Sequence, residues 1–416
     1  MNHAAVTRSL DSAVRRMLAP LLAAEPGPTQ WRLVDWDCET GISITLARGD
    51  VVLLIELEAR DDARGCHART ARFNVGARRA SDEEPLAPDE RRAVDRLVAL
   101  VREREETLPW ASPRPEPSAR VALRLLSSER VLIGEGAGRY YINPYVGCVI
   151  GCEFCYAADR AELSRRLDGQ PAARWGRFVD VKIDAPEVLR REVKDRPPGI
   201  VRLSPIVTDP YQSIERKYRV TRRCLEVLLE AGFTPVVLTR SANVLDDLEL
   251  LARFPRSAVG LSIPTDDDAM RAAFEPGGDP IEARLNALER LHDAGVTTFV
   301  VVQPTLPMNE ARLVERVAPF VHAARIDRMH ERSRVRHLYE RAGRLDAMSD
   351  AFAERTARRL RAGLDRHGIA VDESDDLAGL LERPLSGTSR LTHLYDRLYD
   401  ASTRAEAGEA HAAFMS

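Results

Sequence analysis

The chain has 416 residues, of which 44% are hydrophobic and 30% are charged, and its formal net charge is −3. This length is enough for two or three domains with a sizeable core. The near-neutral charge argues against a dedicated binder of duplex nucleic acid, and the sequence has no run of about 18 apolar residues that would indicate a membrane span.

The first part of the chain, residues 1–108, has the pattern of a small α+β module whose role the sequence does not assign. An amphipathic stretch at about 9–24 predicts a first helix and lacks the features of a signal peptide, so we expect a cytoplasmic protein. Strands are predicted at 31–35, 42–46 and 51–57, and a Gly-Asp turn between the last two indicates a hairpin. A polar helix is predicted at about 88–106.

The rest of the chain divides into three parts. Residues 109–137 contain many Pro and Ser residues, which predicts a linker or crossing segment. Between 138 and 328, short apolar runs alternate with amphipathic helical stretches, which is typical of a parallel sheet covered by helices. The strands are expected at 179–183, 201–207, 235–239, 258–263, 299–303 and about 140–143. We therefore predict an α/β fold with an open, partial (β/α)6 barrel, followed by a helical C-terminal region at 329–416.

Three of the six cysteines, Cys148, Cys152 and Cys155, lie within eight residues. Thiolates are soft ligands that suit zinc or iron–sulfur clusters, and a structural zinc site normally needs a fourth Cys or His. No such ligand lies nearby in the sequence, which favours a [4Fe–4S] cluster with one open iron. Gly147 and Gly151 suit a loop that wraps tightly around it. The alternatives are a zinc site completed by a distant residue and chance clustering.

Phe154 precedes the last cysteine, so the loop resembles the C-x3-C-x-aromatic-C motif of radical S-adenosylmethionine (radical SAM) enzymes. The blocks NPYVGC, TDPYQSIERKYRVTR, LTRSANVLDDLELL and VGLSIPT, in this order between about 140 and 307, resemble the spore photoproduct lyase-like branch of that superfamily. The resemblance implies a partial radical SAM barrel, a [4Fe–4S] cluster and SAM. It also implies an electron donor such as flavodoxin or ferredoxin.

The resemblance further implies which residues hold SAM. Thr208 and Asp209 would take its amino group, Arg240 its carboxylate and Ser262 its ribose. Each has a simpler interpretation, namely a turn before Pro210, an ion pair of Arg240 with one of the acidic residues at 246–247, and a helix cap. Glu215 and Glu275 are weaker candidates for polar contacts.

The expected reaction follows from the same comparison. A DNA photoproduct lyase of this branch uses a cysteine as hydrogen donor just before the amino-binding pair, where this chain has Val207. We therefore expect a radical SAM enzyme that abstracts hydrogen from a small molecule or a peptide, without a nucleic acid or membrane partner. The alternatives are photoproduct repair and a non-catalytic iron–sulfur or zinc protein. Cys224, inside an apolar helical pattern, is expected to be a core residue.

Overall fold

The structure is a computed structural model, and it describes residues 7–8, 31–37, 42–60, 70–79, 85–107, 120–136, 138–158, 161, 165, 170, 173–204, 206–330 and 332–372. The predicted first helix at 9–24 lies outside the described residues. The chain forms two compact units, which are described separately. One comprises Met1–Arg120, Ala157–Trp175 and Leu398–Ser416, and the other comprises Val121–Tyr156 and Gly176–Arg397.

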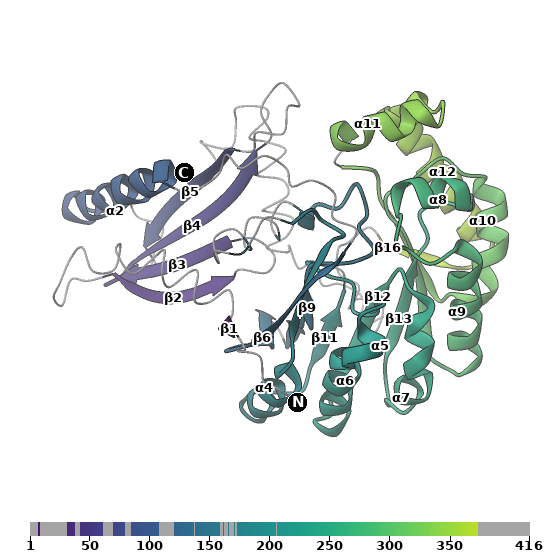
Figure 1. The fold of residues 1–416 in the computed structure, drawn as a ribbon, viewed down its shortest axis with the longest axis horizontal. Helices are drawn as coiled ribbons and strands as arrows, with labels where there is room; N and C mark the ends of the chain where they lie inside the picture. The colour runs from purple at the N-terminus through teal and green to yellow at the C-terminus, as the bar shows by residue number, and fades with distance from the viewer. Residues whose placement is uncertain are drawn as a thin grey trace. The chain divides into compact units, whose positions relative to one another are not determined.

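The first unit contains an antiparallel sheet and a long helix (Figure 1). Besides the two-residue strand β1 (Thr7–Arg8), its strands are β2 (Arg32–Asp37), β3 (Ile42–Arg48), β4 (Val51–Arg60) and β5 (Thr70–Arg79), and the last four pair in chain order. The predicted hairpin is confirmed, since Arg48 pairs with Val51 and Gly49 between them has a φ of 59°. The left-handed φ favours glycine at this turn.

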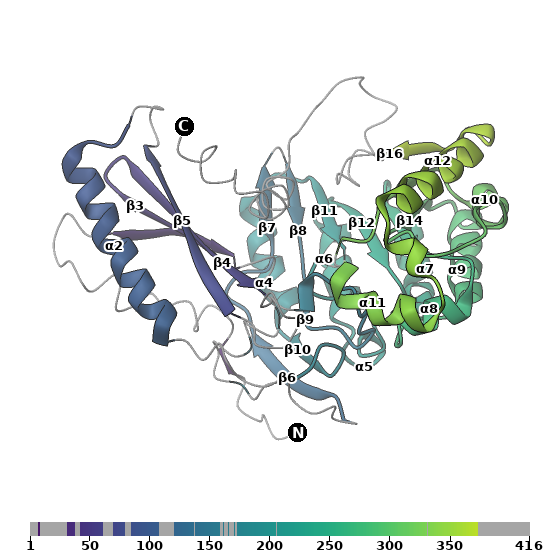
Figure 2. The same cartoon turned by 90° about the horizontal axis from the view of Figure 1, so that it is seen from above.

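Helix α2 (Pro88–Thr107) packs against the sheet next to β5 (Figure 2). Its buried side chains Ala93, Val94, Leu97 and Val101 recur every three or four residues, which places them on one helix face. This helix agrees with the prediction for 88–106. Strand β5 was not predicted.

The second unit is built on an eight-stranded sheet. In sheet order it runs β16-β15-β14-β13-β12-β11-β8-β7. The strands are β7 (Ile133–Gly136), β8 (Arg139–Tyr141), β11 (Ile200–Leu203), β12 (Thr234–Thr239), β13 (Ala258–Ser262), β14 (Thr297–Val302), β15 (Ala323–Ile326) and β16 (Ala370–Asp372). Seven of them are parallel, and β7 is antiparallel to β8.

Helices pack around this sheet, and most of them lie on its outer face (Figure 1). The longer ones are α4 (Ala185–Glu192), α6 (Val220–Glu230), α9 (Ile281–Asp293), α10 (Glu310–Val317), α11 (Arg332–Arg341) and α12 (Asp350–Arg366). The shorter ones are α5 (Glu215–Tyr218), α7 (Leu248–Ala252) and α8 (Asp268–Phe274). The predicted helix in the C-terminal region is α12.

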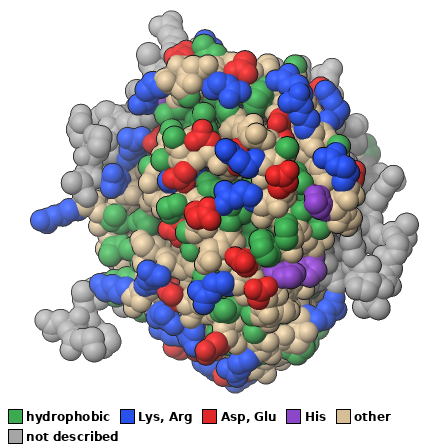
Figure 3. Space-filling view, turned by 90° about the vertical axis from the view of Figure 1, so that its right-hand side faces the viewer, with side chains coloured by type: hydrophobic (Ala, Val, Ile, Leu, Met, Phe, Trp, Pro, Cys, Tyr) green, Lys and Arg blue, Asp and Glu red, His purple; other side chains and the backbone are tan. Residues whose placement is uncertain are grey.

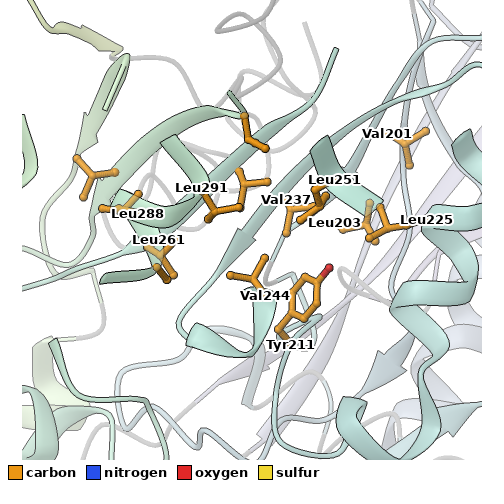
Figure 4. Close-up of a cluster of buried hydrophobic side chains, with 14 of the residues drawn as sticks. Val201, Leu203, Tyr211, Leu225, Val237, Val244, Leu251, Leu261, Leu288 and Leu291 are labelled. Atoms are coloured by element: carbon orange, nitrogen blue, oxygen red, sulfur yellow. The ribbon is translucent and has the colours of Figure 1, made fainter. Parts of the chain in front are cut away.

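The main core lies between the sheet and these helices (Figure 4). Leu203, Val237 and Leu261 point into it from three neighbouring strands, and Leu225 and Leu288 point into it from α6 and α9. All five are 0% exposed, and full burial of one such side chain contributes about 1.5–3 kcal/mol. This packing fixes the strand ends on which the candidate site is built.

The α/β architecture is confirmed, and three details of the prediction are corrected. The apolar run at 179–183 forms β10 (Phe178–Lys182), which pairs with β6 (Ala122–Ser127) and β9 (Tyr145–Val146) in a separate sheet. An apolar run predicts a buried strand but does not determine which sheet it joins.

The predicted linker at 109–137 is wrong for its second half, because β6 and β7 lie there. The C-terminal region is not purely helical, because β16 adds a strand to the sheet beside β15. Both strands β15 and β16 are short, at four and three residues, so their apolar pattern is weak.

Basic and acidic side chains are interspersed with apolar ones over the face shown in Figure 3. This mixture agrees with the near-neutral charge of the chain. Among the described helices, none combines the length and the apolar character needed to cross a membrane.

Candidate functional site

The three clustered cysteines lie on one loop that follows β9. Cys148 and Cys152 are buried, at 6% and 7% exposure, and Cys155 is half-buried. The backbone N–H of Cys155 donates to the carbonyl of Cys152 at 3.1 Å. The loop therefore turns back on itself and brings the three thiols into one region.

Glycines allow the loop to approach its neighbours closely. Gly147 and Gly151 have φ values of 90° and 63°, which other residues rarely adopt. A Cβ atom on Gly147 would lie 2.5 Å from the carbonyl oxygen of Phe178, and one on Gly151 would lie 3.0 Å from the Cα of Gly176. The predicted fit of both glycines to a tight loop agrees with this geometry.

The segment after α8 contacts the loop from another side. The N–H of Gly277 donates to the carbonyl of Ile150 at 2.8 Å, and the N–H of Glu153 donates to the carbonyl of Phe274 at 2.9 Å. A Cβ on Gly277 would lie 2.4 Å from the carbonyl oxygen of Val149. The loop is thus held by backbone contacts as well as by side chains.

The surroundings of the thiols suit a positively charged group. Burial raises the pKa of the Cys148 thiol to about 12, and the Asp209 carboxylate adds to this rise. Burial also raises the pKa of Cys152 well above its ordinary value, although the Arg240 guanidinium lowers it. Buried thiols of this kind become thiolates when a metal centre supplies positive charge.

Three thiol groups on one loop are a donor set that an iron–sulfur cluster can use. Within the described ranges, no three Cys, His, Asp or Glu side chains surround a point where a single metal ion could be held. In a [4Fe–4S] cluster each thiolate binds its own iron, so the cysteines need not converge on one atom.

Thr208 lies in the turn after β11, and its contacts hold the cysteine loop. Its Oγ1 donates to the carbonyl of Gly147 at 2.8 Å. Gln212, which is fully buried, donates to the same carbonyl at 3.2 Å and to Thr208 Oγ1 at 2.7 Å. The Oε1 atom of Gln212 accepts from the N–H of Val149 at 2.9 Å. Sequence reasoning did not identify Gln212 as part of the site, although it belongs to the TDPYQ block.

Asp209 connects two strand ends. Its Oδ1 accepts from the Thr239 hydroxyl at 2.5 Å and from the Tyr211 N–H at 2.9 Å, and its Oδ2 accepts from the Arg240 N–H at 2.8 Å. Burial raises the pKa of Asp209, and these donors oppose the rise. Both carboxylate oxygens are therefore engaged in fixing the turn after β11 to the end of β12.

Arg240 follows β12 and points toward the cysteine loop. Its Nε donates to Glu275 Oε1 at 2.8 Å, and its Nη2 donates to the carbonyl of Gln303 at 3.3 Å. The centre of the Phe154 ring lies 5.8 Å from its guanidinium carbon. The alternative interpretation of an ion pair with 246–247 is wrong. Those two carboxylates pair instead with arginines of α5 and α6, at 2.9 and 2.6 Å.

Glu275 joins Arg240 to a second buried arginine, Arg284 of α9, whose Nη2 lies 2.6 Å from Glu275 Oε2. Burial raises the pKa of Glu275, but the two guanidinium groups outweigh burial and hold this pKa below its ordinary value. The three side chains carry a net charge of +1. Arg284 was missed, and the available signal was its place on the apolar stripe of α9 between Ile281 and Leu288.

Ser262 is the last residue of β13 and is fully buried. In the described part of the chain its Oγ has no hydrogen-bond partner, while its carbonyl accepts from Arg284 Nη1 at 2.7 Å. An unpaired buried hydroxyl is costly unless a ligand completes it. Ser262 therefore stays a candidate ligand-binding residue, and it does not cap a helix.

Two other residues have structural roles. Glu215 accepts from the Tyr145 hydroxyl and from the N–H groups of Thr221 and Arg222, so it caps the start of α6. Cys224 is fully buried in the main core, as expected.

Residues 142–317 match the sequence profile of the Radical SAM superfamily, and this segment contains every candidate site residue. The segment is a radical SAM domain. The expectation of a radical SAM protein is confirmed for this domain, and members of the superfamily use a [4Fe–4S] cluster and SAM.

Curated relatives match about two-fifths of the chain. An uncharacterised protein of Methanocaldococcus jannaschii is 29% identical over 170 residues, which cover 41% of this chain and 61% of the relative. An uncharacterised protein of Mycobacterium tuberculosis is 30% identical over 41% of this chain and 50% of its own length. A radical SAM Nα-GlyT isomerase of Pseudomonas phage M6 is 26% identical over 40% of this chain and 33% of its own length. The matched region spans about half to three-fifths of the first two relatives.

Solved structures with a similar arrangement include a spore photoproduct lyase variant, with a TM-score of 0.45 and 15% identity over 61% of this chain and 82% of that one. Streptococcus suis SuiB, bound to the precursor peptide SuiA, has a TM-score of 0.40 and 12% identity over 75% of this chain and 60% of that one.

Proposed function

We propose that this radical SAM enzyme binds a [4Fe–4S] cluster through Cys148, Cys152 and Cys155 and abstracts hydrogen from a small molecule or a peptide side chain. When bound and reduced, the cluster supplies the electron that cleaves SAM into methionine and a 5′-deoxyadenosyl radical. This radical would take a hydrogen atom from the substrate, which would leave 5′-deoxyadenosine and a substrate radical.

The buried charge around Arg240 carries this proposal. Arg240, Glu275 and Arg284 together carry a net charge of +1 next to Cys152, with side chains at most 13% exposed, and the buried Asp209 carboxylate near Arg240 offsets part of this charge. A buried cation needs a counter-anion, because desolvation is otherwise costly. The carboxylate of SAM is such an anion, and Arg240 is the residue we assign to it.

The other three predicted SAM-binding residues differ in whether their side chains are available to a ligand. The hydroxyl of Ser262 is available to the ribose, since it is buried and has no partner among the described residues. The side chains of Thr208 and Asp209 are engaged in holding the loop and the strand ends. We therefore propose that these two residues shape the amino-group pocket of SAM and leave direct binding to neighbouring backbone carbonyls.

Photoproduct repair is the weaker candidate. Val207 is buried and contributes its carbonyl, which accepts from the N–H of Gly147 at 3.0 Å. A valine side chain cannot donate a hydrogen atom as a thiol does, and residues 201–210 contain no cysteine.

We also propose that a flavodoxin or ferredoxin supplies the electron.

Cluster loading tests the proposal. After anaerobic reconstitution with iron and sulfide, we expect on the order of four irons per chain and a reduced-state electron paramagnetic resonance signal that changes when SAM is added. Cys152→Ala should lose both, and Cys224→Ala, which removes a core thiol, should retain both. A Cys152→Ala protein with the iron content and signal of the wild type would contradict the proposal.

A further inference from the structure

Gln212 makes contacts on both sides of Cys148. Its Oε1 accepts from the N–H of Val149 at 2.9 Å, and its Nε2 donates to the carbonyl of Gly147 at 3.2 Å. One side-chain amide therefore binds the residue before the cysteine and the residue after it.

The same amide is joined to the turn after β11. Its Nε2 also donates to Thr208 Oγ1 at 2.7 Å, and Thr208 in turn donates to the carbonyl of Gly147 at 2.8 Å. The N–H of Gly147 donates to the carbonyl of Val207 at 3.0 Å. The loop and this turn thus share one hydrogen-bond network.

The network continues toward the residue assigned to the carboxylate of SAM. Asp209 accepts from the Thr239 hydroxyl and from the backbone N–H of Arg240. A displacement of the turn would therefore move both the cysteine loop and the backbone of Arg240. Gln212 is 0% exposed, so water cannot replace its hydrogen bonds.

We propose that Gln212 is a positioning residue that fixes Cys148 and couples the cysteine loop to the turn that carries Asp209. That the loop holds a cluster rests on the proposed function, but the fixed position of Cys148 does not, because it follows from hydrogen bonds within the chain. Chemically, the side chain must both accept and donate, which an amide does and which neither a hydrocarbon nor a carboxylate does.

Thiol labelling of the full-length, metal-free protein tests this proposal. Gln212→Leu removes all three hydrogen bonds, so Cys148 should react with iodoacetamide about tenfold faster than in the wild type, the factor expected for one ordinary buried hydrogen bond. Cys224 serves as the internal reference thiol, and peptide mass spectrometry identifies each labelled site. Backbone hydrogen exchange at Val149 should also become faster.

Gln212→Glu separates the accepting function of the amide from its donating function. It is also the test variant if Gln212→Leu does not fold. A carboxylate still accepts from Val149, so this N–H should stay protected, while the lost donors should leave Cys148 labelling faster than in the wild type. Asn309→Ala is the control for general destabilisation, because Asn309 Oδ1 caps α10 away from the cysteine loop. It should leave the Cys148 rate unchanged.

Either of two results would overturn the proposal. The first is that Cys148 in the folded Gln212 variant is labelled at the same rate as in the wild type. The second is that Asn309→Ala accelerates Cys148 labelling as much as the Gln212 variant does. Iron content after reconstitution is measured in parallel, and we expect it to be lower in Gln212→Leu. If the wild type itself bound no iron, the proposed function would fail while the labelling result would still decide the role of Gln212.

Discussion

The Nε atom of Arg240 donates to Oε1 of Glu275 at 2.8 Å, and the second oxygen of this carboxylate lies 2.6 Å from Arg284. One buried carboxylate therefore orients two buried guanidinium groups, one that follows strand β12 and one in helix α9. Because the segment after α8 also contacts the cysteine loop through Gly277, this ion network and the loop form one structural unit.

Glu275→Gln is expected to destabilise the protein strongly. The amide keeps the shape of the side chain but leaves two buried positive charges without an anion, and loss of one partner from a buried pair costs about 3–5 kcal/mol. Denaturant unfolding of the metal-free chain measures this free energy. The control is Glu226→Gln, which breaks a half-exposed Arg222–Glu226 pair and should cost at most about 0.5 kcal/mol. Equal effects of the two substitutions would contradict the assigned role of Glu275.

Ser262→Ala is expected to affect SAM binding more than folding. Removal of an unpaired buried hydroxyl should leave the free energy of unfolding within about 0.5 kcal/mol of the wild type. Loss of a ribose contact should weaken SAM about 5- to 10-fold, measured by equilibrium dialysis with the reconstituted enzyme.

The matched control for this substitution is Ser257→Ala. Ser257 is also buried and lies just before β13, but its hydroxyl donates to the carbonyl of Leu251 at 3.2 Å. This control should cost about 1 kcal/mol of stability and leave SAM affinity unchanged. Unchanged SAM affinity in Ser262→Ala would remove Ser262 from the site.

Gly277→Ala is expected to reduce the iron content of the reconstituted protein. The added Cβ would lie 2.4 Å from the carbonyl oxygen of Val149 and 2.9 Å from the Cα of Ile150, so the loop must shift. Colorimetric iron and sulfide determination measures the effect. Gly134→Ala is the control, because a Cβ there meets no atom within 4 Å. Full iron content in Gly277→Ala would show that the loop tolerates the displacement.

Asp327 is expected to make stability depend on acid pH. Burial raises the pKa of Asp327, but the hydrogen bond from His330 and the charge of Arg325 outweigh burial and lower it overall. A carboxyl whose pKa is lower in the folded state stabilises the fold above its unfolded pKa, about 3.9, and this contribution is lost as the pH falls through the folded pKa.

The measurement for this prediction is urea unfolding between pH 7 and pH 3 in the wild type and Asp327→Asn. The difference in free energy of unfolding between the two proteins should be constant above about pH 5 and should shrink below about pH 4. A difference that grows as the pH falls would have the wrong sign for a lowered pKa.

The sequence pattern predicted those features that depend on neighbouring residues. The hairpin of β3 and β4 follows from a Gly-Asp turn between two apolar runs, and the cysteine loop follows from the spacing of Cys148, Cys152 and Cys155. Both are local, so a few consecutive residues contain the necessary information.

Features that depend on long-range pairing were not predictable in the same way. The apolar run of β10 had the composition of a barrel strand, but its partners are β6 and β9. Arg240 had acidic residues within seven positions, yet its partner Glu275 is 35 residues away. Periodicity reports which residues are buried and does not report which buried group meets which.

The central claim is that Cys148, Cys152 and Cys155 hold the cluster that cleaves SAM. The most direct test is the amount of 5′-deoxyadenosine formed when the reconstituted full-length protein is incubated anaerobically with SAM and dithionite. We expect this product with the wild type and with Cys224→Ala, and none above background with Cys152→Ala. Equal formation of 5′-deoxyadenosine by Cys152→Ala and the wild type would contradict it.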